Sequence, residues 1–265
     1  MLKLRQGEGW NVPPLLEVVD LHKSFGPISV LRGVDLALGT GEVLAIVGDN
    51  GAGKSTLIKH ISGVYKQDKG EIRLNGTRLD LTTPAEARRL GIETVYQDLA
   101  LADDLSVGAN IFLGREPTRR WLGLVPMVDN RKIRAETEAL LSRIESRIPP
   151  GARTVSRLSG GQRQAVAIAR ALYWQAKVVI LDEPTAALAV MERDHVIQLA
   201  RRLAGEGVGV IYIGHNLIEI LDVADRIAVM YRGCIVYAAR AADTTQQELI
   251  KYMTGFSETV PQAAA

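Results

Sequence analysis

The sequence predicts an α/β domain with a mainly parallel sheet, an antiparallel β part near its N-terminal end and a helical insert. Two runs, 43–47 and 178–181, are entirely apolar, which is typical of parallel strands covered on both faces. A third short apolar run at 208–213 is separated from the second by a helical pattern. Residues from about 98 to 175 show helical spacing instead, so we expect a helical subdomain within one domain spanning 15–255.

The first part of the chain supplies most of the expected strands. Residues 1–14 show no periodicity and end in Pro13-Pro14, so we expect a tail there. Asn75-Gly76 follows an apolar run and favours a hairpin turn, whereas Thr83-Pro84 has the N-cap and first-turn preferences of a helix. The strands expected before the helical segment are 15–21, 30–38, 43–47, 70–74 and 92–96, with a helix at 54–62.

The second part begins with helices and returns to alternating elements. The irregular connection between the first two helices contains Pro117, Gly123 and Pro126. Helices are expected at 106–113, 131–148, 160–174, 190–203 and 246–253, and strands at 178–181, 208–213, 226–231 and 235–238. Residues 256–265 are expected to form a C-terminal tail.

The composition excludes several classes of protein. The 265 residues are 47% hydrophobic and 23% charged with a net charge of +2, so bulk charge gives no reason to expect nucleic acid as a partner. The single cysteine, Cys234, allows no internal disulfide and favours a reducing compartment. No apolar core of signal-peptide length follows Lys3 and Arg5, and no uncharged apolar stretch approaches about 18 residues. We therefore expect a cytoplasmic chain that does not cross a membrane by itself.

The stretch that the rest of the chain is expected to serve is a glycine-rich loop, Gly48-Asp49-Asn50-Gly51-Ala52-Gly53-Lys54-Ser55-Thr56. It matches the pattern G-x-x-x-x-G-K-[ST] and lies between an expected strand and an expected helix. Glycines let the backbone bend around phosphate oxygens, and amides at the helix start point at the anion. Lys54 is expected to reach the β and γ phosphates of a nucleotide, and Ser55 to bind Mg²⁺. The alternative is a glycine-rich turn that precedes a helix by chance.

The apolar run 178–181 ends abruptly in two carboxylates, Asp182 and Glu183. A buried carboxylate pair is costly unless a cation or hydrogen-bond donors meet it. In a protein with a phosphate-binding loop, that cation is Mg²⁺, held by the Ser55 hydroxyl and an aspartate at a strand end. Without the loop, two acidic residues in a strand-to-helix connection, with Asp182 as a cap, would be the simpler interpretation.

A second glycine motif decides which kind of phosphate-loop protein the sequence indicates. A serine and two glycines at a helix start, in Leu158-Ser159-Gly160-Gly161-Gln162, make a second place for an anion. Alone, the motif would be an ordinary helix entry with Ser159 as its cap. It lies after the helical insert and just before the acidic strand. That arrangement resembles the ABC ATPase family, and the resemblance covers the chain from about Leu15 to Met253.

The resemblance implies roles for further residues. Phe25 is similar in position to the aromatic that stacks on adenine, and Gln97 to the glutamine that senses Mg²⁺ and attacking water while touching the transport partner. His215 resembles the switch histidine that contacts the γ phosphate. Glu183 resembles the general base that orients the attacking water, and Asp182 the carboxylate that binds Mg²⁺. Taken alone, Phe25 would be a core aromatic, Gln97 polar surface and His215 a structural residue.

The resemblance also implies partners. In this family two domains pack head to tail, so each ATP lies between Lys54 of one copy and Ser159, Gly160, Gly161 and Gln162 of the other. Charge on the transferred γ phosphoryl group is then stabilised from both sides. Integral-membrane permease subunits and an extracytoplasmic solute-binding protein complete such importers. The chain is expected at the inner face of the cell membrane.

A narrower resemblance is to the ATP-binding subunits of simple-sugar importers of the ribose, xylose and fructose type. It rests on three segments, Tyr96–Leu101, Leu105–Val107 and Asn110–Glu116. Many members carry two ATPase domains in tandem, whereas this sequence has one, like the fructose-type members. Two departures stand out: Ala189 replaces the aspartate that contacts the opposite subunit, and Gly214 stands where a serine is common.

The function expected from the sequence is ATP hydrolysis that powers a membrane importer for a monosaccharide. The alternative is a soluble ABC-type ATPase that acts as a mechanical switch on DNA, ribosomes or cluster assembly. The near-neutral net charge and the sugar-importer-like segments oppose that alternative. A phosphate-loop kinase acting on a small molecule would have no use for the second glycine motif.

Overall fold

The computed structural model describes residues 14–121, 125–145, 148, 154–186 and 188–255. Apart from Pro14, the tails expected at 1–14 and 256–265 lie outside these residues. Gly123 and residues 146–147, which belong to the connection and the helix expected there, also lie outside them.

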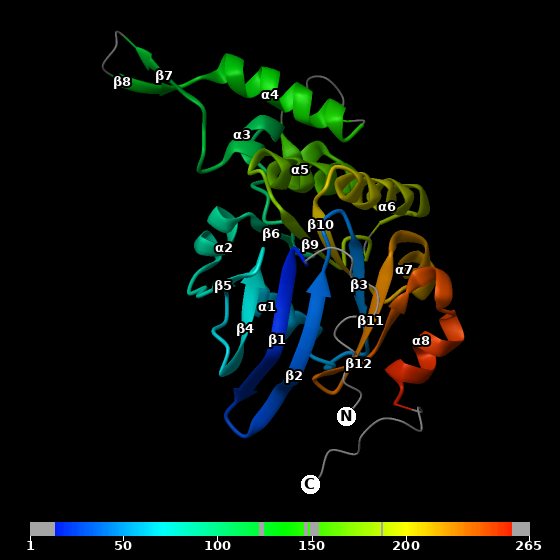
Figure 1. Ribbon diagram of the computed structural model, residues 1–265. Coiled ribbons are helices and arrows are strands. Elements are labelled where there is room, and N and C mark those ends of the chain that lie inside the picture. Colours follow the sequence, from blue (N-terminus) through cyan, green and yellow to red (C-terminus); the bar gives the residue numbers. More distant parts are fainter. Residues whose placement is uncertain (1–13, 122–124, 146–147, 149–153, 187, 256–265) are drawn as a thin grey trace.

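A six-stranded sheet forms the centre of the described chain, in the order β12-β11-β3-β10-β9-β6 (Figure 1). Neighbouring strands run parallel from β11 to β6, and β12 is antiparallel to β11. The carboxyl ends of five strands therefore meet at one edge, where parallel sheets bind their ligands. The strands are β3 (Val43–Val47), β6 (Ile92–Val95), β9 (Val178–Asp182), β10 (Gly209–Ile213), β11 (Arg226–Tyr231) and β12 (Cys234–Arg240).

A second sheet of four antiparallel strands, in the order β2-β1-β4-β5, covers one face of the first. Helix α1 (Lys54–Ile61) lies between the two sheets, because its Leu57, Ile58 and Ile61 share one buried cluster with strands of both. The strands of this sheet are β1 (Leu16–Phe25), β2 (Ile28–Leu38), β4 (Lys69–Leu74) and β5 (Thr77–Leu79).

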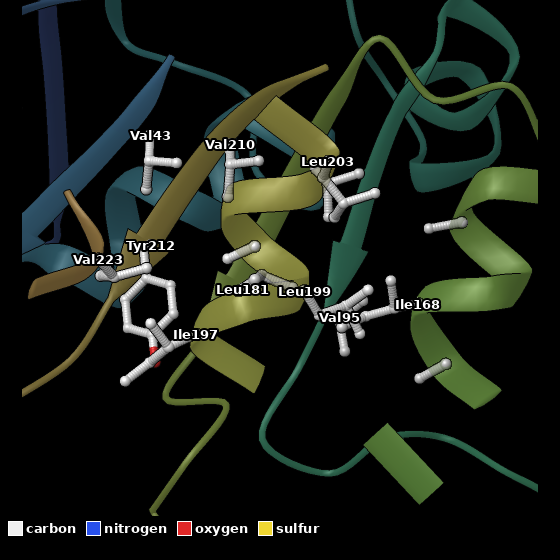
Figure 2. Packing of buried hydrophobic residues seen from close by; sticks show 14 of the residues in the cluster. Val43, Val95, Ile168, Leu181, Ile197, Leu199, Leu203, Val210, Tyr212 and Val223 are labelled. Carbon is white, nitrogen blue, oxygen red and sulfur yellow. The ribbon is translucent and has the colours of Figure 1, made fainter. Parts of the chain in front are cut away.

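Strand β3 shows how one apolar run supports both halves of the core. Side chains alternate along a strand, so Val43, Ala45 and Val47 face the helices on one side, while Leu44 and Ile46 face α1 and the second sheet. All five are essentially fully buried. Figure 2 shows the helix-side cluster, in which Val43 and Val210 lie with Leu199 and Leu203 of α6. Burial of each such aliphatic side chain stabilises the fold by ~1.5–3 kcal/mol.

The helices cover the free face and one end of the parallel sheet. In Figure 1, α3, α4, α5 and a small hairpin of β7 and β8 gather at the top of the view, beyond the end of the sheet. Every helix among the described residues is too short or too polar to span a membrane. The helices other than α1 are α2 (Pro84–Leu90), α3 (Val107–Phe112), α4 (Asn130–Arg143), α5 (Gly160–Tyr173), α6 (Val190–Gly205), α7 (Leu217–Val223) and α8 (Gln246–Met253), with 3₁₀ turns at Val155–Arg157 and Ala241–Asp243.

The predicted fold class is confirmed: a mainly parallel sheet, an antiparallel β part near the N-terminal end and helices between β6 and β9. The limits of the domain, 15–255, and of a helical subdomain at about 98–175 stay predictions. Within that segment the connection expected to be irregular holds a hairpin, because β7 (Thr118–Trp121) and β8 (Val125–Val128) pair antiparallel.

One helix is shorter than predicted, and another is not predicted. The helix expected at 131–148 ends at Arg143, because Glu145 takes a left-handed backbone conformation with φ of 49°. No helix is predicted directly after 208–213, yet α7 follows β10. Its N-cap, Asn216, accepts hydrogen bonds from the amides of Ile218 and Glu219.

Candidate nucleotide site

The loop from Gly48 to Thr56 joins the carboxyl end of β3 to the start of α1. Two of its glycines are required, Gly48 by close approach of the backbone and Gly53 by its backbone conformation. A Cβ on Gly48 would collide with the Met230 carbonyl oxygen, and one on Gly53 would lie 2.8 Å from the Met230 Cε atom. Gly53, with φ of 109°, is also the N-cap of α1, and no side chain caps this helix. The amides of its first turn therefore point into the loop without a side-chain acceptor.

Lys54 is the first residue of α1 and its side chain folds over the loop. Its ammonium group donates to the carbonyl oxygens of Gly48, 2.6 Å away, and Asp49, 3.1 Å away. Burial lowers the pKa of Lys54, while the negative charges of Glu183, Asp49 and Asp182 act in the opposite direction. The predicted phosphate-binding cation and the two predicted carboxylates are therefore electrostatic neighbours.

Asp182 and Glu183 follow the buried part of β9, and both side chains are partly buried. Burial raises the pKa of Asp182, the adjacent Glu183 charge raises it further, and Lys54 opposes both effects. Glu183 has a left-handed backbone conformation with φ of 48°, and its amide donates to the Ile213 carbonyl oxygen of β10 at 3.0 Å. This unusual conformation for a non-glycine residue is thus held by the neighbouring strand.

His215 lies two residues beyond β10, and its Nδ1 atom is 3.8 Å from Oε2 of Glu183. A cleft of about 50 Å³ opens at these strand ends, lined among others by Glu183, Thr185, Arg193, Gly214, His215 and Glu219. A broader surface hollow of about 570 Å³ around residues 66–70 contains no predicted site residue. The small cleft is the better candidate for a functional site, because the predicted residues Glu183 and His215 line it, although the surface hollow is larger.

The second glycine motif begins α5 and is arranged differently. Ser159 and Gln162 form a capping box: the Gln162 amide donates to Ser159 Oγ at 3.4 Å, and the Ser159 amide donates to Gln162 Oε1 at 3.1 Å. A Cβ on Gly161 would lie 3.1 Å from Cβ of Glu192, and one on Gly160 would lie 2.6 Å from Leu188. The described contacts of this motif are thus with the start of α6.

The last two predicted residues lie at exposed positions. Phe25, expected ahead of the second strand, is the final residue of β1 and is 41% exposed, with its ring 5.3 Å from that of Tyr65. Gln97 is exposed two residues after β6. The structure therefore brings Lys54, Asp182, Glu183 and His215 together. Gln97 follows β6, the neighbour of β9, at the same edge of the sheet, but no described contact joins Gln97, Phe25 or the Ser159 motif to these four residues.

Comparison with known proteins agrees with the motifs. The family model described as "ABC transporter" matches residues 31–186, more than half of the sequence. The chain belongs to the ABC transporter family. As a member of this family it is an ATP-binding protein and an ATPase, as the sequence predicts.

Individual relatives narrow the comparison. A xylose/arabinose import ATP-binding protein of Sulfolobus acidocaldarius is 48% identical over 92% of this chain and 95% of its own length. A fructose import ATP-binding protein of Rhizobium meliloti is 41% identical over 95% and 98%, respectively. A ribose import ATP-binding protein of Rubrobacter xylanophilus is 43% identical over 92% of this chain, which spans only 48% of that relative's length. The predicted resemblance to simple-sugar importer subunits is confirmed.

A solved structure supports the ABC fold directly. An ATP-binding cassette of an ABC transporter, in its ADP conformation, superposes with a TM-score of 0.77 and 27% identity, covering 92% of this chain and 96% of that one. This chain therefore has the architecture of an ATP-binding cassette.

The donor atoms present fit a Mg²⁺ ion beside the glycine loop. Magnesium takes oxygen ligands and few protein groups, because it keeps several waters. Ser55 offers an exposed hydroxyl in the first turn of α1, and Asp182 offers a carboxylate whose raised pKa a nearby cation would lower again. Within the described ranges no cluster of three or more His, Cys, Asp or Glu residues could hold a metal by itself.

One buried polar group beside this site is not predicted from the sequence. Glu219 on α7 is 7% exposed and accepts hydrogen bonds from Thr185 and Tyr212. In the sequence, the acidic residue between Ile218 and Ile220 is the signal for this group, and it becomes informative only once a helix is placed there.

The departures from the family pattern also have local consequences. Ala189 is the N-cap of α6 without a side-chain bond, and Gly214 packs near Tyr212 and Ile220.

Proposed function

We propose that this chain is the ATP-hydrolysing subunit of a membrane importer for a monosaccharide. One observation supports it above all: Lys54, Asp182, Glu183 and His215 meet at the carboxyl ends of three neighbouring strands, β3, β9 and β10. The names of the relatives, which are import proteins for xylose, arabinose, ribose and fructose, support the choice of solute class. They do not favour a soluble ATPase acting on DNA, ribosomes or cluster assembly.

The proposed chemistry is attack of a water on the γ phosphate of ATP, which breaks the bond between the γ phosphorus and the bridging oxygen and releases ADP and phosphate. The loop amides at 48–56 and the Lys54 ammonium bind the phosphates, where a fixed cation stabilises the charge of the transferring group. Glu183 orients the water and takes its proton, and His215, 3.8 Å from Glu183, contacts the γ phosphate. Phe25 stacks on the adenine from the tip of the β1–β2 hairpin.

Ser55, Gln97 and Asp182 are the residues proposed to hold Mg²⁺. When bound, the ion neutralises part of the charge on the phosphate oxygens. Asp182 is suited to this place because it ends a buried strand directly after Leu181, where burial and the adjacent Glu183 charge raise its pKa. Gln97 is proposed to join the site from its exposed position after β6 and to report on it to the permease.

A second copy completes the proposed site. The glycine loop of one copy would face Ser159, Gly160, Gly161 and Gln162 of the other, with ATP between them. The separate position of this motif in a single chain, against α6 rather than near Lys54, supports a head-to-tail pair. The described helices cannot span a membrane, so the pathway is proposed to be supplied by permease subunits at the inner face of the membrane. An extracytoplasmic solute-binding protein would deliver the sugar.

A deletion strain tests the choice of solute. Growth on a panel of pentoses and hexoses should show a selective defect that the wild-type gene restores and a Lys54→Ala copy does not. Retained growth on every sugar, together with lost uptake of an unrelated solute, would contradict sugar import while leaving ATP hydrolysis in place. Purification from membranes should recover the permease subunits with the chain.

A further inference from the structure

Glu219 is a buried acidic residue that the proposed chemistry does not use. It lies on α7 and is 7% exposed, whereas its neighbour Ile218 is 70% exposed. A carboxylate removed from water is costly unless donors satisfy it. The fold therefore places an acidic group where an apolar one would be expected, and hydrogen bonds must compensate.

Two hydroxyl groups from distant parts of the chain supply those hydrogen bonds. Thr185 donates from Oγ1 to Oε1 of Glu219 at 2.6 Å, and the Tyr212 hydroxyl donates to the same oxygen. Thr185 is 8% exposed and Tyr212 is fully buried in the helix-side core, in the same cluster as Ile197 and Val223 (Figure 2). Burial and the Glu219 contact raise the pKa of Tyr212, so its phenol stays a neutral donor.

These partners stand close in sequence to Glu183 and His215, and Thr185 and Glu219 line the same cleft. Thr185 is two residues after Glu183, Tyr212 is three residues before His215, and Glu219 is four residues after it. The Glu183 amide is itself bonded to the Ile213 carbonyl oxygen, 3.0 Å away. One carboxylate oxygen thus ties the loop that follows β9 to the strand and the helix on either side of His215.

We infer that Glu219 is a positioning residue, which holds the loop of Glu183 and the loop of His215 at a fixed separation across the cleft. The inference rests on the proposed roles of Glu183 and His215. The 3.8 Å between Oε2 of Glu183 and Nδ1 of His215 depends on two separate loops. One follows β9, and the other joins β10 to α7. A shared acceptor of two hydroxyls fixes that separation without contacting the nucleotide site formed by the glycine loop.

Two substitutions of Glu219 separate positioning from general stability. Glu219→Ala removes the acceptor, and kcat for ATP hydrolysis should fall about 10- to 100-fold, because small displacements of reacting groups have effects of that size. KM and the dissociation constant of ATP should stay within about twofold, since Lys54 and the loop are untouched. Glu219→Gln keeps one oxygen that can accept both hydroxyls, so it should recover most of the lost kcat.

The two donors provide independent variants that preserve shape. Thr185→Val and Tyr212→Phe each remove one hydroxyl, and each should lower kcat about threefold to tenfold with unchanged ATP affinity. Thr137→Val is the matched control for the first, because Thr137 is also 8% exposed and bonds within its own helix, to the Ile133 carbonyl oxygen. Tyr173→Phe is the control for the second, since that hydroxyl donates to the Arg115 carbonyl oxygen. Both controls should hydrolyse ATP at the wild-type rate.

The outcomes distinguish this inference from the proposed function. A wild-type chain without ATPase activity would contradict the proposed function. Normal ATPase activity in the wild type and an unchanged kcat in Glu219→Ala would contradict the positioning role alone. So would a Glu219→Ala variant that loses ATP affinity in proportion to kcat. If Glu219→Ala does not fold, Thr185→Val and Tyr212→Phe decide: kcat values equal to those of their controls would overturn the inference.

Discussion

The N-termini of α1 and α5 both begin with glycine-rich motifs, yet the chain treats them in opposite ways. Helix α1 has Gly53 as its N-cap, with φ of 109° and no side-chain cap. Helix α5 has Ser159 as its N-cap, closed by a capping box with Gln162. One helix start is therefore open to an outside acceptor, and the other already uses its own side chains as acceptors.

The surroundings of the two helix starts extend this difference. Beside α1 stands a cation, Lys54, which donates to the loop carbonyl oxygens of Gly48 and Asp49. Beside α5 stands an anion: a hydrogen bond from Ser159 lowers the pKa of Glu192, with backbone bonds from Ala189 and Gly161 adding to the effect. On the proposed function, one chain thus carries a prepared phosphate site at α1 and a second site at α5 that has to give up internal contacts before it accepts a phosphate.

The largest expected effect comes from Lys54→Ala. The substitution removes the cation from the prepared site, so ATP binding should weaken and turnover should fall to background, a loss of at least about 10²-fold. Nucleotide binding and phosphate release measure the two effects. Lys59→Ala is the matched control, because Lys59 lies on the same helix and its ammonium faces the Tyr65 ring 5.4 Å away. Normal activity in Lys54→Ala would show that the prepared site lies elsewhere.

Glu183→Gln should give the next largest effect. A glutamine keeps size and hydrogen bonding but cannot take a proton, so hydrolysis should slow about 10²- to 10⁴-fold while ATP still binds. ATP with Mg²⁺ should then hold two copies together, visible on a sizing column at high protein concentration. A wild-type rate would exclude Glu183 as the base. ATP trapped by a monomer would show that the second helix start plays no part.

How far the sequence predicts these two helix starts depends on how local their causes are. Strand β3, the glycine loop and α1 follow from adjacent residues, an entirely apolar run and a fixed glycine spacing, so they are predicted almost to the residue. The capping box of Ser159 is also local, since both partners lie in one turn. The position of Glu192 at that box depends on how α5 and α6 pack, which no local pattern encodes.

Helix α7 shows the same limit. Its residues, Leu217–Val223, are too few for a clear helical periodicity, and the Asn216 cap and burial against the core specify the helix. Its Glu219 gains a buried place through hydroxyls that lie 34 and 7 positions away in sequence. The β7–β8 hairpin is likewise missed, because Pro117 just before it and Pro126 within β8 favour an irregular connection.

Ser159→Arg tests the second helix start in the Glu183→Gln background. The arginine side chain is longer than that of serine and positively charged, so it crowds the start of α5 and removes its cap. The ATP-dependent dimer should therefore be lost while each copy still binds ATP. Ser106→Arg is a matched control, because Ser106 caps α3 in the same way, accepting from the Ala109 amide at 3.1 Å. A control that also abolishes the dimer would mean that capping, not the phosphate site, explains the result.

The smallest expected effect tests the comparison most sharply. Glu192 packs against Gly161 and accepts a hydrogen bond from Ser159, so its negative charge occupies the surroundings that a γ phosphate of the partner copy would need. Glu192→Gln keeps the shape and the acceptor oxygen but removes the charge. In the Glu183→Gln background, the ATP concentration that gives half dimer should fall about two- to fivefold, the size of effect that one charge has at a helix N-terminus.

Glu248→Gln provides the control for this shift. Glu248 is the third residue of α8, as Glu192 is the third residue of α6. Its side chain accepts from the amide of its own N-cap, Thr245, at 2.9 Å. Its neutralisation weakens a cap of the same kind without touching α5, so the half-dimer concentration should stay where it is. An unchanged or higher value in Glu192→Gln would mean that the carboxylate does not oppose the phosphate. The capping box of Ser159 would then remain as the described contact that the second site has to give up.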